Sequence, residues 1–395
     1  MQSLQLVMLA TLVASAVALP SGRSSTSLAP TAVAEGPCDI TGAAGQPCVA
    51  AHSTVRALYG KYDGGLYVVQ KNHTQEQMTI GVLKPGGFAD KAKHDNFCAK
   101  LGCVILKIHD QSPMKNHLTQ RHGLINASRH PIIVGDGVGV YGMWFDPGYG
   151  YHVDDTRGIA KDNEPESIYA VMSGSRHTGA DAAHKGCCFD YGNSEGKAAG
   201  NTSDGSGAME AIYFGNTHWM QNAGDNTTKG PDGKLLDGPW VGADLEAGMY
   251  YGGGKETKYN MRNKPLIQPF VSLYLRGGTG GFALKGGDAT KGKLRTMYDG
   301  PRPDCNVGVI TPPAHDAGKS ICTRQKHNPY NVKRNITPSY QPMHKQGAIV
   351  LATGGDNSNS AIGNFYEGIM VTGVTSDATD DLVQANIVAV NYKNV

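Results

Sequence analysis

The feature that most limits the fold of this 395-residue chain is that its apolar segments are short and are separated by glycine, aspartate or proline. Glycine alone supplies 53 residues, which is roughly twice its average usage. Short apolar runs bounded by such residues are typical of β-strands, because glycine and proline interrupt longer helical patterns. A fold rich in strands and loops is therefore predicted.

The segments that fit a strand are bounded by turn-forming residues, and several alternate apolar and polar positions: 65–70, 103–109, 131–134, 138–145, 167–172, 209–214, 269–275, 281–285, 348–353 and 365–372. Helical periodicity is confined to residues 48–58, 89–101 and 377–390, the last with Ser376 as its N-cap. This balance favours an all-β fold in which a β-sandwich forms one domain over residues 36–395.

The beginning of the chain differs from the rest. Residues 6–19 are mostly apolar and contain, near their end, Ala16-Val17-Ala18, a small-x-small pattern typical of signal-peptide cleavage. We therefore expect a signal peptide over residues 1–18, a flexible leader over residues 19–35, and a secreted, extracellular protein. No later apolar run reaches that length, so no membrane association is expected. The formal net charge of +2 gives no reason to expect a nucleic-acid partner.

Eight cysteines fit the oxidising environment of a secreted protein. Pairing within each neighbouring couple is the simplest framework, although spacing does not fix connectivity: Cys38–Cys48, Cys98–Cys103, Cys187–Cys188 and Cys305–Cys322. A disulfide between the adjacent Cys187 and Cys188 would present a flat apolar face suited to the floor of a sugar pocket. The alternatives are that these two cysteines bridge elsewhere or stay free. Asn-X-Ser/Thr sequons predict glycosylation on surface loops at Asn72, Asn126, Asn201, Asn226 and Asn335.

Several motif-like patterns lack the context that a functional site of their kind requires. Residues 192–196, GNSEG, match a nucleophile elbow, but loop-forming residues follow where an elbow needs a helix. Residues 277–281, GGTGG, fit a hairpin turn better than a dinucleotide-binding loop. Residues 225–237 lack the ligand order of a calcium loop, and the 14 histidines show no zinc-binding spacing. We expect no metal and no cofactor.

Two segments carry acids in positions where hydrolysis of a glycosidic bond could use them, since that reaction needs one ionised and one protonated carboxyl. In residues 240–246, WVGADLE, an extended chain would project Asp244 and Glu246 from the same face. In residues 348–359, AIVLATGGDNSN, two glycines that permit close approach of a ligand precede Asp356. Acids at strand ends are mostly just solvated, so spacing alone leaves their role open.

Seven motifs occur in order between residues 36 and 392: GPCDI, CVAAHSTVRALY, IHDQSPMKNHLTQ, CCFDYGN, MEAIYFGN, GPWVGADLE and GGDNSNSAIGNFYEGIM. Together they resemble the catalytic domain of family 54 glycoside hydrolases, the secreted α-L-arabinofuranosidases. The resemblance implies a concanavalin-like β-sandwich, or jelly roll, with a few short helices. It also implies retaining hydrolysis that removes terminal α-L-arabinofuranosyl groups from plant cell-wall arabinan and arabinoxylan. We expect a monomer.

The resemblance assigns roles to particular residues. The nucleophile of the family is the glutamate of its D-x-E segment and falls on Glu246, while the acid/base aspartate of GGDN falls on Asp356. The implied substrate-binding residues are Cys187, Cys188, Trp219, Asp244 and Gly355, together with Ala247 and Gly248 beside the nucleophile.

The chain also departs from the family pattern. Ala247 stands where the family usually has an asparagine, and it removes an amide that would contact the sugar. Three alternatives stay open: a lectin-like protein that binds sugar without hydrolysis, an enzyme for a β-D-galactofuranoside or β-D-xyloside, and a structural or adhesive secreted protein in which no pocket joins Glu246 and Asp356. Segments 222–238 and 301–345 are longer than in the family, and we expect its C-terminal arabinose-binding β-trefoil to be absent. We expect little retention on insoluble arabinoxylan, and strong depletion in a pull-down would contradict this.

Overall fold

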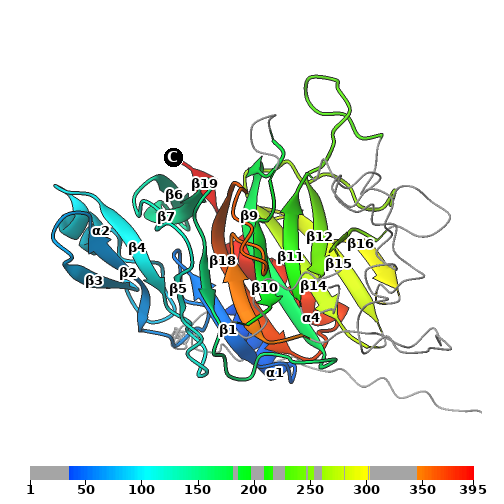
Figure 1. Cartoon of the computed structure of the whole chain (residues 1–395), viewed down its shortest axis with the longest axis horizontal. Helices are drawn as coiled ribbons and strands as arrows, with labels where there is room; N and C mark the ends of the chain where they lie inside the picture. The colour runs from blue at the N-terminus through cyan, green and yellow to red at the C-terminus, as the bar shows by residue number, and fades with distance from the viewer. Residues whose placement is uncertain are drawn as a thin grey trace, which may run out of the picture. The chain divides into compact units, whose positions relative to one another are not determined.

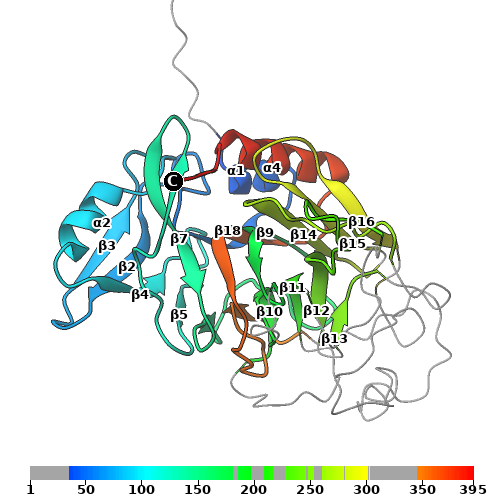
Figure 2. The same ribbon diagram turned by 90° about the horizontal axis from the view of Figure 1, so that it is seen from above.

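The strands of the computed structural model fall into two antiparallel sheets (Figures 1 and 2). The structure describes residues 35–180, 186–196, 209–216, 227–245, 248–252, 260–279, 281–300, 302 and 345–395. These residues lie in a compact unit that extends over residues 34–395. No helix in these ranges is long and apolar enough to cross a membrane.

Nine of the described strands form the first sheet: β1 (Cys48–Ser53), β6 (His130–Val134), β7 (Val138–Phe145), β9 (Glu166–His177), β14 (Val271–Gly277), β15 (Phe282–Asp288), β16 (Arg295–Gly300), β18 (Gly363–Thr372) and β19 (Lys393–Asn394). Their order is β16-β15-β14-β9-β18-β7-β6-β19, and β1 pairs with β18.

Ten described strands form the second sheet: β2 (Gly65–Lys71), β3 (Gln77–Gly81), β4 (Cys103–Ile108), β5 (Leu118–Gln120), β8 (Tyr151–Val153), β10 (Asp190–Ser194), β11 (Glu210–Gly215), β12 (Trp240–Leu245), β13 (Gly248–Tyr250) and β17 (Ala348–Leu351). Their order is β13-β12-β11-β10-β17-β8-β5-β4-β2-β3. Strands β10, β11 and β12, which position the candidate site, are neighbours in this sheet.

The two sheets pack face to face through buried aromatic side chains. Tyr191 of β10 packs on Phe365 of β18 with ring centroids 5.1 Å apart, and Phe145 of β7 packs on Tyr151 of β8 at 6.0 Å. Inward-facing residues of both sheets belong to one continuous apolar core. The predicted all-β sandwich is therefore confirmed, and each segment predicted as a strand contains one.

Three helices occur in the described ranges: α1 (Pro37–Ala43), α2 (Lys91–Cys98) and α4 (Asp377–Ala389). The predictions for 89–101 and 377–390 are confirmed, and the Ser376 hydroxyl accepts a hydrogen bond from the Thr379 amide as an N-cap. Helix α1 was not predicted, although Pro37 at its first position is a helix-start signal. Helix α4 covers the face of the nine-stranded sheet that points away from the ten-stranded sheet (Figure 2).

The prediction of a helix over residues 48–58 is wrong. Residues Cys48–Ser53 form strand β1, in which all six residues are buried. A strand covered on both faces is apolar throughout, so its apolar residues also occur three and four positions apart and imitate helical periodicity. Pairing with β18 decides the conformation.

Three disulfides lie in the described part of the chain. Cys38–Cys48 joins α1 to β1, Cys98–Cys103 joins the end of α2 to the start of β4, and Cys187 is bonded to Cys188. The predicted pair Cys305–Cys322 lies outside the described residues. Among the sequons, Asn72 and Asn126 are exposed, whereas the other three lie outside the described residues.

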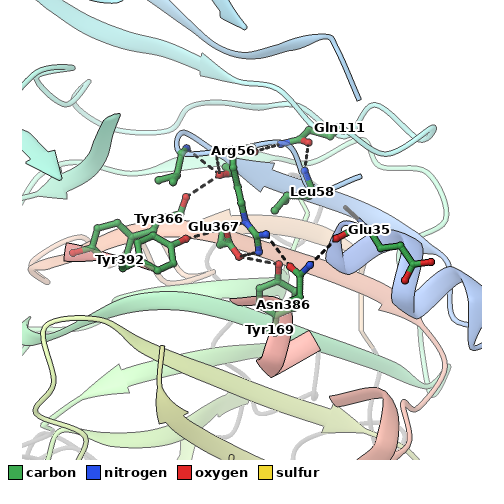
Figure 3. A network of polar contacts seen from close by, with 11 residues as sticks. Glu35, Arg56, Leu58, Gln111, Tyr169, Tyr366, Glu367, Asn386 and Tyr392 are labelled. Atoms are coloured by element: carbon green, nitrogen blue, oxygen red, sulfur yellow. Dashed lines mark hydrogen bonds and ion pairs between the residues drawn. The ribbon is translucent and has the colours of Figure 1, made fainter. Parts of the chain in front are cut away.

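A buried ion pair ties helix α4 and the chain after β1 to the nine-stranded sheet (Figure 3). Two guanidinium nitrogens of Arg56 donate to the Glu367 carboxylate of β18, each at 2.6 Å. The third nitrogen donates to Asn386 of α4 at 2.8 Å, and the hydroxyls of Tyr392 and Tyr169 donate to Glu367 at 2.9 and 3.3 Å. Because Glu367 is fully buried, its charge depends on these donors.

Candidate active site

The Cys187–Cys188 disulfide rests on the loop that follows strand β17. The amide and the hydroxyl of Ser360 both donate to the Cys187 carbonyl, at 3.1 and 3.2 Å. The Ser358 hydroxyl lies 3.7 Å from the Cys188 sulfur and donates to it. This contact joins two segments that are about 170 residues apart in the sequence, and the second of them, the loop after β17, carries Asp356.

The loop of residues 352–360 is held in a compact turn. The amide of Gly354 donates to the Ser358 carbonyl at 2.9 Å, and the Thr353 hydroxyl donates to the same carbonyl at 2.9 Å. A Cβ atom at Gly355 would overlap the carboxylate of Glu195, so any larger residue there would have to displace the Glu195 side chain. The two glycines therefore allow the loop to approach the end of strand β10 closely.

Asp356 projects from this turn and is exposed. The amide of Ser358 donates to one of its carboxylate oxygens at 2.8 Å, which orients the carboxyl. The next residue, Asn357, has a left-handed backbone with φ of 70°, a conformation that asparagine tolerates better than most residues. Its side chain accepts a hydrogen bond from Arg121 at 2.5 Å, which connects the turn to the loop after β5.

Asp244 lies on strand β12 and is 7 % exposed. One of its carboxylate oxygens and the two sulfurs of Cys187 and Cys188 all lie within 4.8 Å of one another. Burial raises the pKa of Asp244 to about 7, and the negative charges of Asp356 and Glu195 add to the rise. The disulfide, Asp244 and Asp356 thus belong to one site.

The sulfurs and Asp244 also form the one His/Cys/Asp/Glu group in the described ranges whose donor atoms are close enough to share a metal ion. Both sulfurs are bonded to each other, so neither is a thiolate that could act as a ligand. The group therefore does not fit a metal site.

Two acids that sequence reasoning did not single out lie at the same place. Asp190 of β10 is fully buried, and Glu195, just after that strand, is 7 % exposed and lies against Gly355. Asp190 could have been suspected because it follows Cys188 by two residues in the CCFDYGN motif. The GNSEG pattern does not form a nucleophile elbow, because Asp190–Ser194 is a strand and Ser194 is buried.

Other predicted site residues can be placed only in part. Gly248 begins strand β13 and pairs with Leu245, so it lies beside the strand that carries Asp244. Glu246, Ala247 and Trp219 lie outside the described residues.

The chemistry of this arrangement favours a neutral ligand that is rich in hydroxyl groups. Carboxylates accept hydrogen bonds from hydroxyls and repel anions. The disulfide offers an apolar surface for carbon atoms, and Gly355 lets the Glu195 carboxylate lie directly against the loop that carries Asp356. An exposed acid beside a buried acid of raised pKa is the environment that acid/base catalysis uses.

Comparison with known proteins assigns the chain to a family. A sequence profile described as "Alpha-L-arabinofuranosidase B, catalytic" matches residues 37–312 and 318–393. The alpha-L-arabinofuranosidase B of Aspergillus niger is 38% identical over 374 residues, and that of Emericella nidulans is 39% identical over 374 residues. These matches cover 91% of this chain and 64% and 62% of the two relatives, so the chain spans less than two thirds of their length.

Solved structures agree with this assignment. A GH54 α-L-arabinofuranosidase soaked with a cyclic sulfate inhibitor superposes with a TM-score of 0.74 at 37% identity, over 91% of this chain and 66% of that chain. An arabinofuranosidase complexed with arabinofuranosyl-alpha-1,2-xylobiose gives the same TM-score, identity and coverage.

Proposed function

Because the chain belongs to the catalytic family of alpha-L-arabinofuranosidase B, family 54 of the glycoside hydrolases, we propose that it is a retaining α-L-arabinofuranosidase. Its substrates would be terminal α-L-arabinofuranosyl groups on arabinan- or arabinoxylan-type polysaccharides. The observation that carries the proposal is that Asp244, Asp356 and the Cys187–Cys188 disulfide gather at one site from three separate parts of the chain.

In the proposed mechanism, Glu246 attacks the anomeric carbon while protonated Asp356 donates its proton to the leaving oxygen. A covalent arabinosyl-enzyme forms, and water deprotonated by Asp356 then releases arabinose with retained configuration. The two carboxyls would lie about 5–5.5 Å apart, the separation that a retaining mechanism uses. The orientation of the Asp356 carboxyl by the Ser358 amide supports this role.

The other proposed site residues would bind the sugar. Asp244 would accept hydrogen bonds from ring hydroxyls, and the disulfide and Trp219 would contact the apolar face of the ring. Because a related enzyme was crystallised with arabinofuranosyl-alpha-1,2-xylobiose, we include arabinose side chains on xylan among the substrates. Gly355 and Gly248 would allow close approach of the ligand.

We further propose that the protein is secreted, glycosylated and monomeric. The disulfides Cys38–Cys48 and Cys98–Cys103 support an oxidising compartment, since such bonds rarely persist in the cytosol. The exposure of Asn72 and Asn126 is compatible with N-glycosylation at both.

The activity is tested by release of p-nitrophenol from p-nitrophenyl α-L-arabinofuranoside by the purified protein at mildly acidic pH. Clear release, with arabinose of retained configuration as the first product, supports the proposal. A folded protein that releases nothing from this substrate but hydrolyses a β-D-galactofuranoside or β-D-xyloside, or only binds arabinose, would overturn it.

Ala247 allows a test of substrate contact beside the proposed nucleophile. Replacing it with asparagine is expected to restore one hydrogen bond to the sugar, worth about 1 kcal/mol, and so to raise kcat/KM by about fivefold to tenfold. Steady-state kinetics on the chromogenic arabinofuranoside measure this change. An Ala247→Ser variant serves as the matched control with a shorter polar group, and unchanged kcat/KM in the asparagine variant would argue against a sugar contact at this position.

A further inference from the structure

Asp190 carries a buried carboxyl group that no N–H or O–H donor of the described residues contacts. It is fully buried on strand β10, and neither of its carboxylate oxygens receives a hydrogen bond from a donor group in the described residues. A carboxylate that is isolated in this way is costly to bury. Its presence inside the site therefore requires an explanation.

Strand register places Asp190 and Asp244 on the same face of the ten-stranded sheet. Tyr191 of β10, Ile212 of β11 and Ala243 of β12 are aligned across the three strands and face the core. Side chains alternate along a strand, so the preceding Asp190 and the following Asp244 both point to the opposite face. The two carboxyls lie within hydrogen-bonding reach of each other there.

Two carboxyls can form a hydrogen bond only when a proton lies between them. The charged or titratable groups of the described residues that act on this pair are all acidic, namely Asp356, Glu195 and the buried Tyr213. Burial raises the pKa of Asp190 well above its ordinary value, and the charge of Asp244 raises it further. The pair therefore keeps a proton at mildly acidic and neutral pH.

We propose that Asp190 is a positioning residue of the active site, which donates a shared proton to Asp244 and thereby fixes the carboxyl that binds the sugar. The part of this inference that concerns the sugar rests on the proposed function. The shared proton also removes one of two neighbouring negative charges. When the shared proton is lost at high pH, the two carboxylates repel each other, and the Asp244 side chain loses its support.

The first test measures the proton directly and does not depend on activity. Infrared spectra of the wild type at pH 5 to 8 are expected to contain a carboxylic-acid C=O band that persists at neutral pH and is weakened in Asp190→Asn. Because buried Glu166 also has a raised pKa, of about 8, the difference between variant and wild type is the relevant signal. Asp110→Asn, a buried aspartate that accepts three backbone amide hydrogen bonds, is the matched control and should keep the band. An unchanged band in Asp190→Asn overturns the inference.

The second test separates positioning from folding. With p-nitrophenyl α-L-arabinofuranoside, Asp190→Ala should raise KM by about tenfold, the loss of one charge-assisted hydrogen bond, with a smaller change in kcat. In the wild type KM should rise at alkaline pH, where the shared proton is lost. Asp190→Asn should have a KM that is independent of pH in this range, because its amide donates to Asp244 without a titrating proton. A wild-type KM that does not change with pH, or that changes equally in Asp190→Asn, contradicts the proposal.

If no variant hydrolyses the substrate, the proposed function fails while the infrared result still decides the protonation of the pair.

Discussion

Replacing Glu246 with glutamine is expected to lower kcat for p-nitrophenyl α-L-arabinofuranoside by several orders of magnitude. The amide has nearly the shape of the carboxylate but cannot form the covalent arabinosyl-enzyme, so the step that it would catalyse is lost. KM should change much less than kcat, because the sugar contacts of Asp244 and the disulfide remain. Single-turnover and steady-state kinetics on the purified variant measure both constants.

The matched control for this variant is Glu76→Gln, which changes the same side chain in an exposed ion pair with Lys71. It should have wild-type kinetics, so a loss seen in both variants would indicate a preparation artefact. Activity of Glu246→Gln within about tenfold of the wild type, in a protein with an unchanged melting temperature, would contradict the assignment of the nucleophile.

Replacing Arg56 with methionine is expected to reduce the free energy of unfolding by about 3–5 kcal/mol. The substitution leaves the fully buried Glu367 carboxylate without the cation that donates to both of its oxygens. It also removes the link from this ion pair to Asn386 of α4 (Figure 3). Equilibrium denaturation by urea, monitored by circular dichroism and tryptophan fluorescence, measures the change in stability.

Lys71→Met is the matched control for this prediction, since it removes a cation from the solvent-exposed pair Lys71–Glu76 and should change the free energy of unfolding much less. The double variant Arg56→Met/Glu367→Gln should lose less than the sum of its single changes, because the orphaned charge is absent. If Arg56→Met were no more destabilising than Lys71→Met, the buried pair could not be what anchors α4 to the sheet.

Part of the fold was predictable because burial leaves a local pattern in the sequence. Segments such as 138–145 alternate or are continuously apolar between turn residues, and the structure contains a strand there with the same bounds. The segment 48–58 was predicted wrongly for a related reason. Strand β1 is covered on both faces, so its residues are apolar throughout, and a continuous apolar run does not distinguish a buried strand from a buried helix.

The candidate site likewise contains some residues that the sequence indicated and others that it did not. Asp244 could be singled out because an extended segment places it on the same face as Glu246, and Asp356 because it follows an apolar strand and two glycines; the adjacent cysteines are conspicuous in any sequence. Asp190 and Glu195 could not, because their importance depends on what lies beside them. Asp190 meets Asp244 only after β11 has paired with both β10 and β12, and Glu195 meets Gly355 only when the loop of residues 352–360 has closed on it.

The class of fold, the likeness to family 54 and the local elements that carry the candidate acids were therefore predictable, because these depend on residues close together in the chain. Which side chains meet follows from the folded chain and not from any local segment. Strands β10, β12 and β17 and the disulfide come together through long-range pairing, which a local pattern does not encode. Burial of neighbouring carboxyls then raises the pKa of Asp190 and Asp244, a property that neither residue has alone.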